Sequence, residues 1–262
     1  MLARPAFAPR GLEHFLSGFD AAAEMSASLS DPDALPGGTA LCKAAGQLCY
    51  MSFGPRRTPN AEAERYFANI IASGHGSVLE HAVYSFLIYG VSRSLTHELV
   101  RHRAGFAFSQ VSQRYVSGAV LRFVERPEFV DDPPLHEAFV RRIDAIAAQY
   151  SAMQRDLGEM QKHGDSVLAG QTGTERRKRV QQAARALLPN ETEAPIIVSG
   201  NVRAWRHFIE ARGNSHADIE IRVLASIVLS CLRRAEPILF GDYEETELSD
   251  GTVSITTVHR KV

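Results

Sequence analysis

The sequence predicts a protein of the α+β class, in which a few short strands lie among long helices. Segments with apolar residues at helical spacing make up most of the 262 residues. The β-branched and aromatic segments between them are few, and they do not alternate regularly with helices as in a doubly wound parallel sheet. No internal repeat, low-complexity tract or linker divides the sequence, so we expect a single domain over residues 1–262.

The first predicted elements are two helices, a buried strand and a third helix. A helix is predicted within the segment 36–52, which opens with a Pro-Gly-Gly breaker. Another, over 61–74, ends at a glycine, which often terminates helices. The strand, over 82–91, is rich in β-branched and aromatic residues. The third helix is predicted over 92–103, because Ser92 is suited to cap its N-terminus.

The rest of the sequence predicts longer helices and two short strands. Apolar residues at helical spacing indicate the helices, and β-branched residues indicate the strands. The predicted order is a strand over 112–126, helices over 135–163 and 175–189, a strand over 193–201, and helices over 202–214 and 216–240. The tail that follows is acidic and then strand-like, and we expect it to be loosely held.

Composition and charge narrow the possible functions. Lys plus Arg total 29 and Asp plus Glu total 30, a net charge of -1, which disfavours a general polyanion binder. Cys42, Cys49 and Cys231 form no CxxC pair and lie in apolar helical stripes, so we expect core residues rather than disulfides or nucleophiles. The N-terminus lacks the unbroken apolar run of a signal peptide, and we expect a cytoplasmic protein.

Several common catalytic motifs are absent from the sequence. It has no GxGxxG after a strand, no GxxxxGK followed by Ser or Thr, and no GxSxG, which argues against Rossmann, P-loop and α/β-hydrolase folds. His97 and His102 are five residues apart, whereas the two histidines of a zincin helix are four apart on one face. We therefore expect no metal site.

The strongest candidate site is a polar cluster that begins within the predicted helix over 92–103. Arg101, His102 and Arg103 would point in directions about 100° apart on that helix. Arginine forks match phosphate oxygens and imide groups, so this fan is suited to hold a pyrophosphate and the edge of a flavin or nucleobase. For Arg-His-Arg alone, a solvated basic helix end is favoured by roughly two to one. The hydroxyls and the amide that follow, Ser109, Gln110 and Ser112, favour a binding site instead, and the cluster also contains Glu98 and Arg114.

Three further clusters are less specific. Arg203 and His207 are four residues apart and share a helix face, although a solvated flank explains them equally well. The histidine-containing segment 74–81 is also explained by the end of one element and the start of another. The charged run 175–179, two turns before Arg185, is interpreted by itself as a solvated face.

Taken together, these motifs resemble those of the flavin-dependent thymidylate synthases. Several separated motifs in the right order are far more specific than one motif. The similar segments are His75, Ser77 and the Glu80-His81 pair, residues 91–103, the SQVSQRY stretch, ARALLP around Arg185, and residues 200–222. The resemblance extends over about 36–243, which makes this region the core of the domain and the two ends extensions.

The resemblance implies both an architecture and a reaction. It implies helices around a mainly antiparallel sheet, assembled as a homotetramer with active sites between subunits. Methylenetetrahydrofolate would give one carbon to C5 of a uridine monophosphate, and FAD, reduced by NADPH, would supply the reducing equivalents that make it a methyl group. The implied acceptor is dUMP, which becomes dTMP.

The resemblance also assigns residues to the two ligands. Arg212 occupies the place of an arginine thought to help ionise N3 of the uracil, which gives it the one catalytic assignment. The implied flavin-binding residues are His75, Ser77, Glu80, Arg101, His102, Arg103, Gln110, Asn201, Arg203, His207 and His216. The implied nucleotide-binding residues are Glu98, Arg101, Gln110, Val111, Ser112, Gln113, Arg114, Arg185 and Arg212.

One departure from the family pattern concerns the substrate. The family has seven residues between Arg-His-Arg and the serine matching Ser112, whereas AGFAFSQV places eight there, and Ala107 stands where many members have serine. A ribonucleotide C5-methylase acting on UMP is therefore an alternative. A flavin- or nucleotide-binding module without turnover is a remoter one. An RNA-binding protein is disfavoured by the net charge and by the lack of an aromatic-rich basic face.

Overall fold

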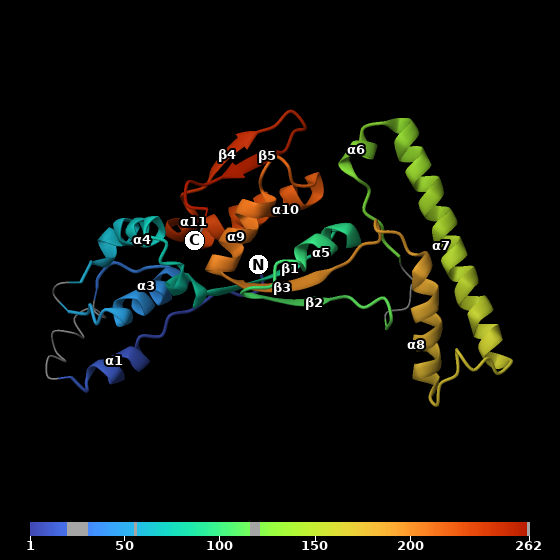
Figure 1. Ribbon diagram of the computed structural model, residues 1–262, viewed down its shortest axis with the longest axis horizontal. Helices are drawn as coiled ribbons and strands as arrows, with labels where there is room; N and C mark the ends of the chain where they lie inside the picture. Colours follow the sequence, from blue (N-terminus) through green and yellow to red (C-terminus); the bar gives the residue numbers. More distant parts are fainter. Residues whose placement is uncertain (20–30, 55–56, 116–120, 261–262) are drawn as a thin grey trace. The chain divides into compact units, whose positions relative to one another are not determined.

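The computed structural model describes residues 1–19, 31–54, 57–115 and 121–260. Its chain forms two compact units. Unit 1 contains Met1–Leu87, His102–Ala107 and Val198–Val262, and unit 2 contains Ile88–Arg101 and Phe108–Ile197. Figure 1 labels the α-helices and β-strands of both units, which are described in turn.

Unit 1 is built mainly from helices around an aromatic core. The buried Trp205 packs edge-on against Phe86, Phe106 and Phe208, with ring centroids 5.1, 4.8 and 5.7 Å away. Such edge-to-face pairs contribute stability beyond the burial of their area. The helices of this unit are α1 (Arg10–Leu16), α3 (Gly37–Cys49), α4 (Ala63–Ala72), the 3-10 helices η2 (Asn60–Glu62) and η3 (Gly76–Glu80), α9 (Val202–Arg212), α10 (Ile219–Ala235) and α11 (Pro237–Phe240).

A three-stranded sheet has the order β1-β3-β2. Its strands are β1 (Val83–Ile88), β2 (Phe106–Gln110) and β3 (Ile196–Asn201). Backbone bonds at the strand ends define antiparallel pairing, because residue numbers rise along one strand as they fall along its neighbour. These bonds run from Val202 N to Ala82 O and from Ala194 N to Val91 O for β1 and β3, and from Asn201 N to Gly105 O and from Val111 N to Pro195 O for β2 and β3.

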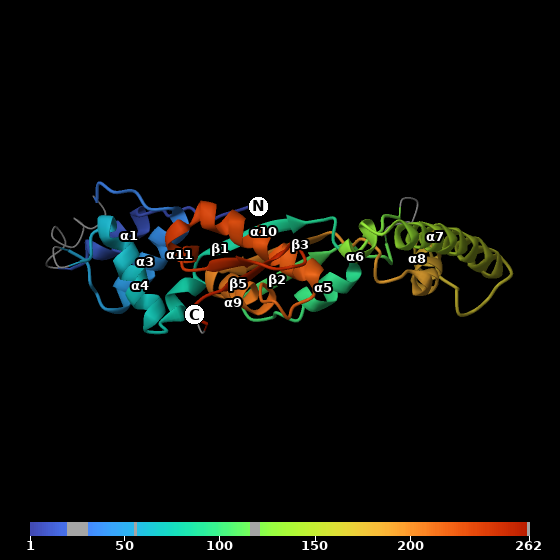
Figure 2. The ribbon, with the colours of Figure 1, turned by 90° about the horizontal axis from the view of Figure 1, so that it is seen from above.

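Unit 2 consists largely of two long helices joined by a short connection. The helix α7 (Pro133–Lys162) packs against α8 (Gly173–Ala184), and the two lie side by side in both views (Figure 1, Figure 2). A capping box starts α8: the Thr172 side chain accepts from Glu175 N while the Glu175 side chain accepts from Thr172 N. The unit's other helices are α5 (Arg93–Leu99), α6 (Pro127–Val130) and the 3-10 helix η4 (Arg185–Leu187).

The C-terminal tail forms an antiparallel hairpin of β4 (Glu244–Glu247) and β5 (Val253–Thr256). The strand β5 packs against α9 and α10. Ile255 is 1% exposed, and its backbone N–H donates to Gly213 O at 2.7 Å. The expectation of a loosely held tail is therefore wrong, because the hairpin buries an apolar residue in unit 1.

The α+β class and most of the predicted elements are confirmed. The helices expected over 36–52, 61–74 and 135–163 correspond to α3, α4 and α7, and the strands expected over 82–91 and 193–201 correspond to β1 and β3. The hydrogen bonds that relate the three strands also confirm the mainly antiparallel sheet.

Three predicted elements are wrong in their limits or their position. The helix expected over 92–103 ends at Leu99. Within the strand expected over 112–126, residues 116–120 lie outside the described part of the chain, and the described residues form no strand. The strand of this region is β2, which lies earlier in the sequence. The helix expected over 216–240 is interrupted at Glu236, whose φ of -141° and ψ of 69° leave the helical region before a proline.

Among the described residues, no helix combines the length and the apolar character that crossing a bilayer requires.

Candidate active site

The Arg-His-Arg sequence lies in a turn rather than on a helix. The helix α5 begins as expected, because the Ser92 side chain accepts a hydrogen bond from Leu95 N at 3.1 Å. It ends at Leu99, and the turn that leads into β2 contains Gly105 with a φ of 74°. The expected fan at 100° steps is therefore wrong, and the direction of each side chain in 101–103 is set by the turn.

The side chain of His102 is held inside unit 1 by other rings and by an arginine. Its ring centroid lies 5.6 Å from that of His207 and 5.4 Å from that of Phe208, both in α9. Arg212 Nε donates to His102 Nε2 at 2.9 Å. Burial, together with the charge of Arg212 and with His207, lowers the pKa of His102 to about 4. His102 is therefore a neutral hydrogen-bond acceptor at neutral pH.

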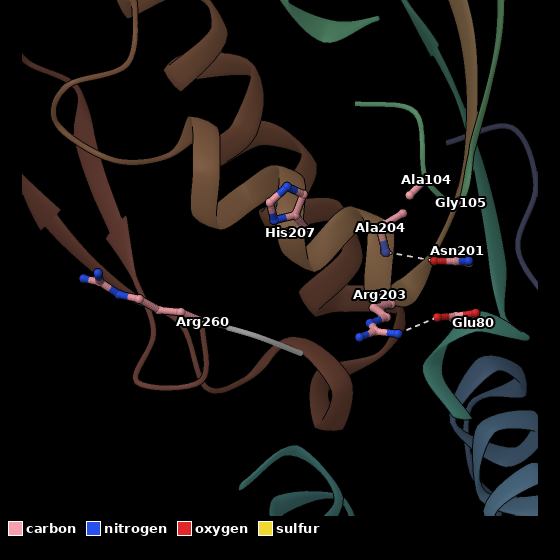
Figure 3. Close-up of a pocket in the computed structure, with 8 residues that line it drawn as sticks. All are labelled: Glu80, Ala104, Gly105, Asn201, Arg203, Ala204, His207 and Arg260. Carbon is pink, nitrogen blue, oxygen red and sulfur yellow. Dashed lines mark hydrogen bonds and ion pairs between the residues drawn. The ribbon is translucent and has the colours of Figure 1, made fainter. Parts of the chain in front are cut away.

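A cavity of about 390 Å³ opens beside this cluster, entirely within unit 1. Its volume is in the range of small-molecule sites. The side chains converge on it from η3, from the turn before β2, from the first turns of α9 and from the tail (Figure 3). The lining residues are Glu80, Ala104, Gly105, Asn201, Arg203, Ala204, His207 and Arg260.

Three polar residues of this cavity, Glu80, Arg203 and Asn201, are held by local hydrogen bonds. Arg203 Nη1 forms an ion pair with Glu80 Oε1 at 2.6 Å. Asn201 caps α9, because its Oδ1 accepts from Ala204 N at 2.8 Å. A Cβ at Gly105 would lie 2.8 Å from Asn201 Nδ2, so only glycine leaves this asparagine in place.

The other residues assigned to the flavin are placed less centrally. His75, Ser77, Arg103 and His216 are exposed, and they are not among the described residues that line the cavity. The structure therefore brings Glu80, Asn201, Arg203 and His207 together, with His102 packed against His207. The remaining flavin assignments, Arg101 and Gln110, lie in unit 2.

All the residues assigned to the nucleotide except Arg212 lie in unit 2. Gln110 Nε2 donates to Thr96 Oγ1 at 3.0 Å, which ties the end of β2 to α5. Two buried donors in the next segment, Gln113 Nε2 and Arg114 Nε, have no hydrogen-bond partner among the described residues. A buried donor without a partner costs free energy, so these atoms are suited to meet a ligand's acceptors.

A second cavity, of about 410 Å³ and entirely within unit 2, contains Arg114. The α8 residues Glu175, Lys178 and Arg179 also line it. Lys178 Nζ lies 4.7 Å from the ring centroid of Tyr115, and Lys178 lowers the pKa of the Tyr115 hydroxyl, chiefly through a hydrogen bond.

The interpretation of 175–179 as a purely solvated face is therefore incomplete. Glu175 belongs to the capping box of α8, but Lys178 contributes a cation to a cavity. Lys178 and Arg185 are seven residues apart, about two helical turns, but α8 ends at Ala184, and Arg185 lies in η4 and is not among the described residues that line this cavity.

Comparison with known proteins identifies the family. A family model described as "Thymidylate synthase complementing protein" matches residues 32–238. A protein of Mycolicibacterium gilvum named "Flavin-dependent thymidylate synthase" is 48% identical over 225 residues, covering 84% of this chain and 86% of the relative. The chain belongs to the flavin-dependent thymidylate synthase family. Relatives of the same name from Mycobacterium marinum and Mycobacterium leprae are 46% and 44% identical, with the same coverage.

The unit 1 cavity fits the flavin of this family in its donor chemistry. A flavin dinucleotide needs cationic donors for its pyrophosphate and amide or imidazole donors for its ring edge. Arg203, Asn201 and His207 supply these groups around one cavity. Gly76 protects the arrangement, because a Cβ there would lie 2.9 Å from Arg203 Nε.

The cysteines of this family member show no sign of a nucleophilic role. Cys42 is fully buried, and burial raises the pKa of its thiol to about 12. Cys231 is partly exposed, and Cys49 is exposed, so the expectation that all three are core residues is wrong for Cys49. Cys49 is the last residue of α3, at the end where the apolar stripe of this helix leaves the core. None of the three lines either of the two cavities described above.

Proposed function

We propose that this chain is a flavin-dependent thymidylate synthase that converts dUMP to dTMP. In this reaction, methylenetetrahydrofolate gives the carbon and NADPH the reducing equivalents. The observation that carries the proposal is identity of 44–48% to relatives of that name over 84% of the chain. The Arg203, Asn201 and His207 cavity supports it independently, because it offers the donors that a flavin requires.

The flavin site we propose consists of the eleven residues assigned above. Bound FAD supplies the hydride and electron transfer that amino-acid side chains cannot perform. Arg203 would bind a phosphate. Asn201, Arg203 and Ala204, at the N-terminus of α9, line the same cavity, so the partial positive charge of this helix end lies beside it. His102, as a neutral acceptor, orients Arg212.

The nucleotide site we propose consists of the residues assigned to the nucleotide above, Arg212 included. A nucleoside monophosphate carries close to two negative charges, so Arg101, Arg114 and Arg185 suit its phosphate. The unpartnered donors Gln113 Nε2 and Arg114 Nε support binding there. Arg212 would stabilise negative charge at N3 of the uracil, which makes C5 more nucleophilic.

We also propose that the chain is a single domain and that it forms the homotetramer implied by the resemblance, with active sites between subunits. Exposed apolar side chains on unit 1 support self-association: Val83 and Leu87 on β1 are 47% and 46% exposed, and Val223 and Ile227 on α10 are 40% and 56% exposed. A cytoplasmic location follows from the proposed use of NADPH and a free nucleotide.

Turnover with isotope-labelled substrate tests the reaction and its acceptor together. Release of tritium from C5-labelled dUMP and UMP is measured side by side with FAD, NADPH and methylenetetrahydrofolate. Preferential release from dUMP is expected, whereas release from UMP would favour the ribonucleotide C5-methylase suggested by the eight-residue spacing before Ser112. No release from either nucleotide would leave only a binding module.

The colour of the purified protein is the simplest test of flavin binding. Oxidised flavin absorbs at about 450 nm, so the protein should be yellow. A colourless preparation that takes up no added FAD would contradict the proposed function.

A further inference from the structure

The end of the C-terminal tail forms part of the wall of the unit 1 cavity. Arg260 lines the cavity together with Glu80, Arg203 and His207. In Figure 3 it lies across the cavity from Glu80 and Asn201. None of the residues assigned to the flavin by resemblance comes from the tail, so Arg260 is an additional cation at this site.

A buried network holds the tail in this position. The guanidinium of Arg206, a fully buried residue of α9, binds both carboxylate oxygens of Asp242 at 2.6 and 2.7 Å. Thr257 Oγ1 donates to Asp242 Oδ2 at 2.7 Å, and His259 N donates to Thr257 Oγ1 at 3.1 Å. The chain is therefore fixed up to the residue before Arg260, so the approach of Arg260 to the cavity is built into the fold.

The charges around the cavity leave Arg260 available for an anion. Arg203 is paired with Glu80, whereas Arg260 has no hydrogen-bond or ion-pair partner among the described residues. The two arginines and one carboxylate give the lining a surplus positive charge. The side chain of Arg260 is exposed and extends away from the other labelled side chains in Figure 3. An exposed side chain changes rotamer within nanoseconds, so its guanidinium can turn toward a bound anion.

We propose that Arg260 binds a phosphate of the flavin dinucleotide, and that Thr257 positions it through Asp242 and Arg206. The proposal rests on the proposed function, since it concerns the same flavin. A phosphate is the ligand group that best matches a guanidinium fork. NADPH carries the same chemistry, but the cavity that Arg260 lines is the one lined by the Asn201, Arg203 and His207 set, which favours FAD.

The test is FAD affinity of the full-length protein after its flavin is removed, measured by quenching of flavin fluorescence. For Arg260→Gln we expect the Kd for FAD to rise about fivefold, and for Arg260→Lys, which keeps the charge, to stay within about twofold. Arg234→Gln is the matched control, because Arg234 is an exposed arginine of α10 outside the cavity. It should leave the Kd unchanged.

The positioning role of Thr257 is tested by a double-mutant cycle. Thr257→Val should raise the Kd for FAD about threefold, by releasing the end of the tail. If Thr257 acts only through Arg260, the double variant Thr257→Val/Arg260→Gln should bind FAD like Arg260→Gln alone. If the Kd for FAD of the double variant instead rises by the product of the two single-variant factors, the positioning role is refuted.

A second measurement separates FAD from NADPH. The rate of flavin reduction is followed against NADPH concentration at saturating FAD. An unchanged Kd for FAD in Arg260→Gln, with or without weaker NADPH saturation, overturns the proposal; weaker saturation would assign the phosphate to NADPH instead. Failure of this proposal can be told apart from failure of the proposed function. A wild-type protein that binds FAD without forming thymidylate would contradict the proposed function, yet its Kd for FAD could still be compared with that of Arg260→Gln.

Discussion

At the scale of single residues, the contact between His102 and Arg212 determines what each can do. Arg212 donates through Nε, so the direction of its guanidinium is tied to the imidazole that accepts this bond. The low pKa of His102, about 4, keeps that acceptor unprotonated throughout the neutral range. The two residues therefore act as a pair, with His102 as the positioning residue and Arg212 as the proposed contact to the uracil.

The substitution His102→Phe tests this pairing. Phenylalanine preserves the ring packing against α9 but removes the acceptor, so we expect kcat to fall about tenfold or more, since misplaced catalytic groups lose rate steeply. In His102→Gln, the side-chain oxygen can accept from Arg212 and should restore part of the rate. An unchanged kcat in His102→Phe would show that the bond does not matter. As a separate readout, the pKa of His102 measured by NMR should rise in Arg212→Gln, because a neighbouring positive charge is gone.

Lys43 provides a residue-level prediction about stability and pH. It is 3% exposed, its Nζ donates to Asn60 Oδ1 at 2.5 Å, and burial followed by the charge of Arg57 lowers its pKa to about 8. Between pH 8 and the ordinary value of 10.5, the unfolded chain binds more protons at this lysine than the folded chain does. The contribution of Lys43 to the free energy of unfolding therefore rises with pH across this window.

The variant Lys43→Met should flatten that rise. Urea unfolding measured between pH 8 and 10.5 should show a slope against pH that is smaller by up to about 1.4 kcal/mol per pH unit. Lys162→Met is the control, because the Lys162 side chain is 71% exposed and should leave the slope unchanged. Equal slopes for wild type and Lys43→Met would contradict the lowered pKa.

At the scale of elements, the start of α3 depends on a carboxylate that is almost 200 residues away in the sequence. The Glu236 side chain is buried between α10 and α11 and accepts hydrogen bonds from Gly38 N and Thr39 N, both at 2.9 Å. It also accepts from Thr39 Oγ1 and from the Tyr84 hydroxyl, both at 2.5 Å. The first-turn amides of α3, which have no partner within the helix, are thereby satisfied.

Glu236→Gln should therefore destabilise unit 1 substantially. The new amide would point donors at donors in a buried site, and we expect a loss of about 3 kcal/mol in the free energy of unfolding measured with urea. Tyr84→Phe removes only one donor and should cost about 1 kcal/mol. Glu247→Gln, at an exposed carboxylate of β4, should have no effect. A loss no larger for Glu236→Gln than for this control would refute the capping role.

The elements that the sequence predicted correctly are those whose signal is local. Apolar spacing located α3, α4 and α7, and the side-chain cap predicted at Ser92 marks a real helix start. Helix ends were harder to predict, because the sequence pattern of α5 continues past Leu99 and only the turn at Gly105 shows where the chain leaves it. The strand β2 is five residues long, and its pairing with β3 is a non-local interaction that sequence patterns do not display.

At the scale of the whole molecule, the candidate residues divide between the two units. Of the flavin set, all but Arg101 and Gln110 lie in unit 1, and of the nucleotide set, all but Arg212 lie in unit 2. The resemblance identified both sets but not this division, because Arg101 and His102 are consecutive in the sequence and fall in different units. The tail was missed as a contributor because its anchoring depends on Asp242 and Arg206, a contact that no local pattern reveals.

This division predicts that the affinities for the two ligands respond to different substitutions. Arg203→Gln removes a guanidinium from the unit 1 cavity, so the Kd for FAD should rise about tenfold while the KM for dUMP at saturating FAD stays within about twofold. Arg185→Gln, in unit 2, should do the opposite. Each variant is the control for the other, because both replace one arginine by glutamine. If either substitution weakened the binding of both ligands equally, the assignment of Arg203 to the flavin and of Arg185 to the nucleotide would be wrong.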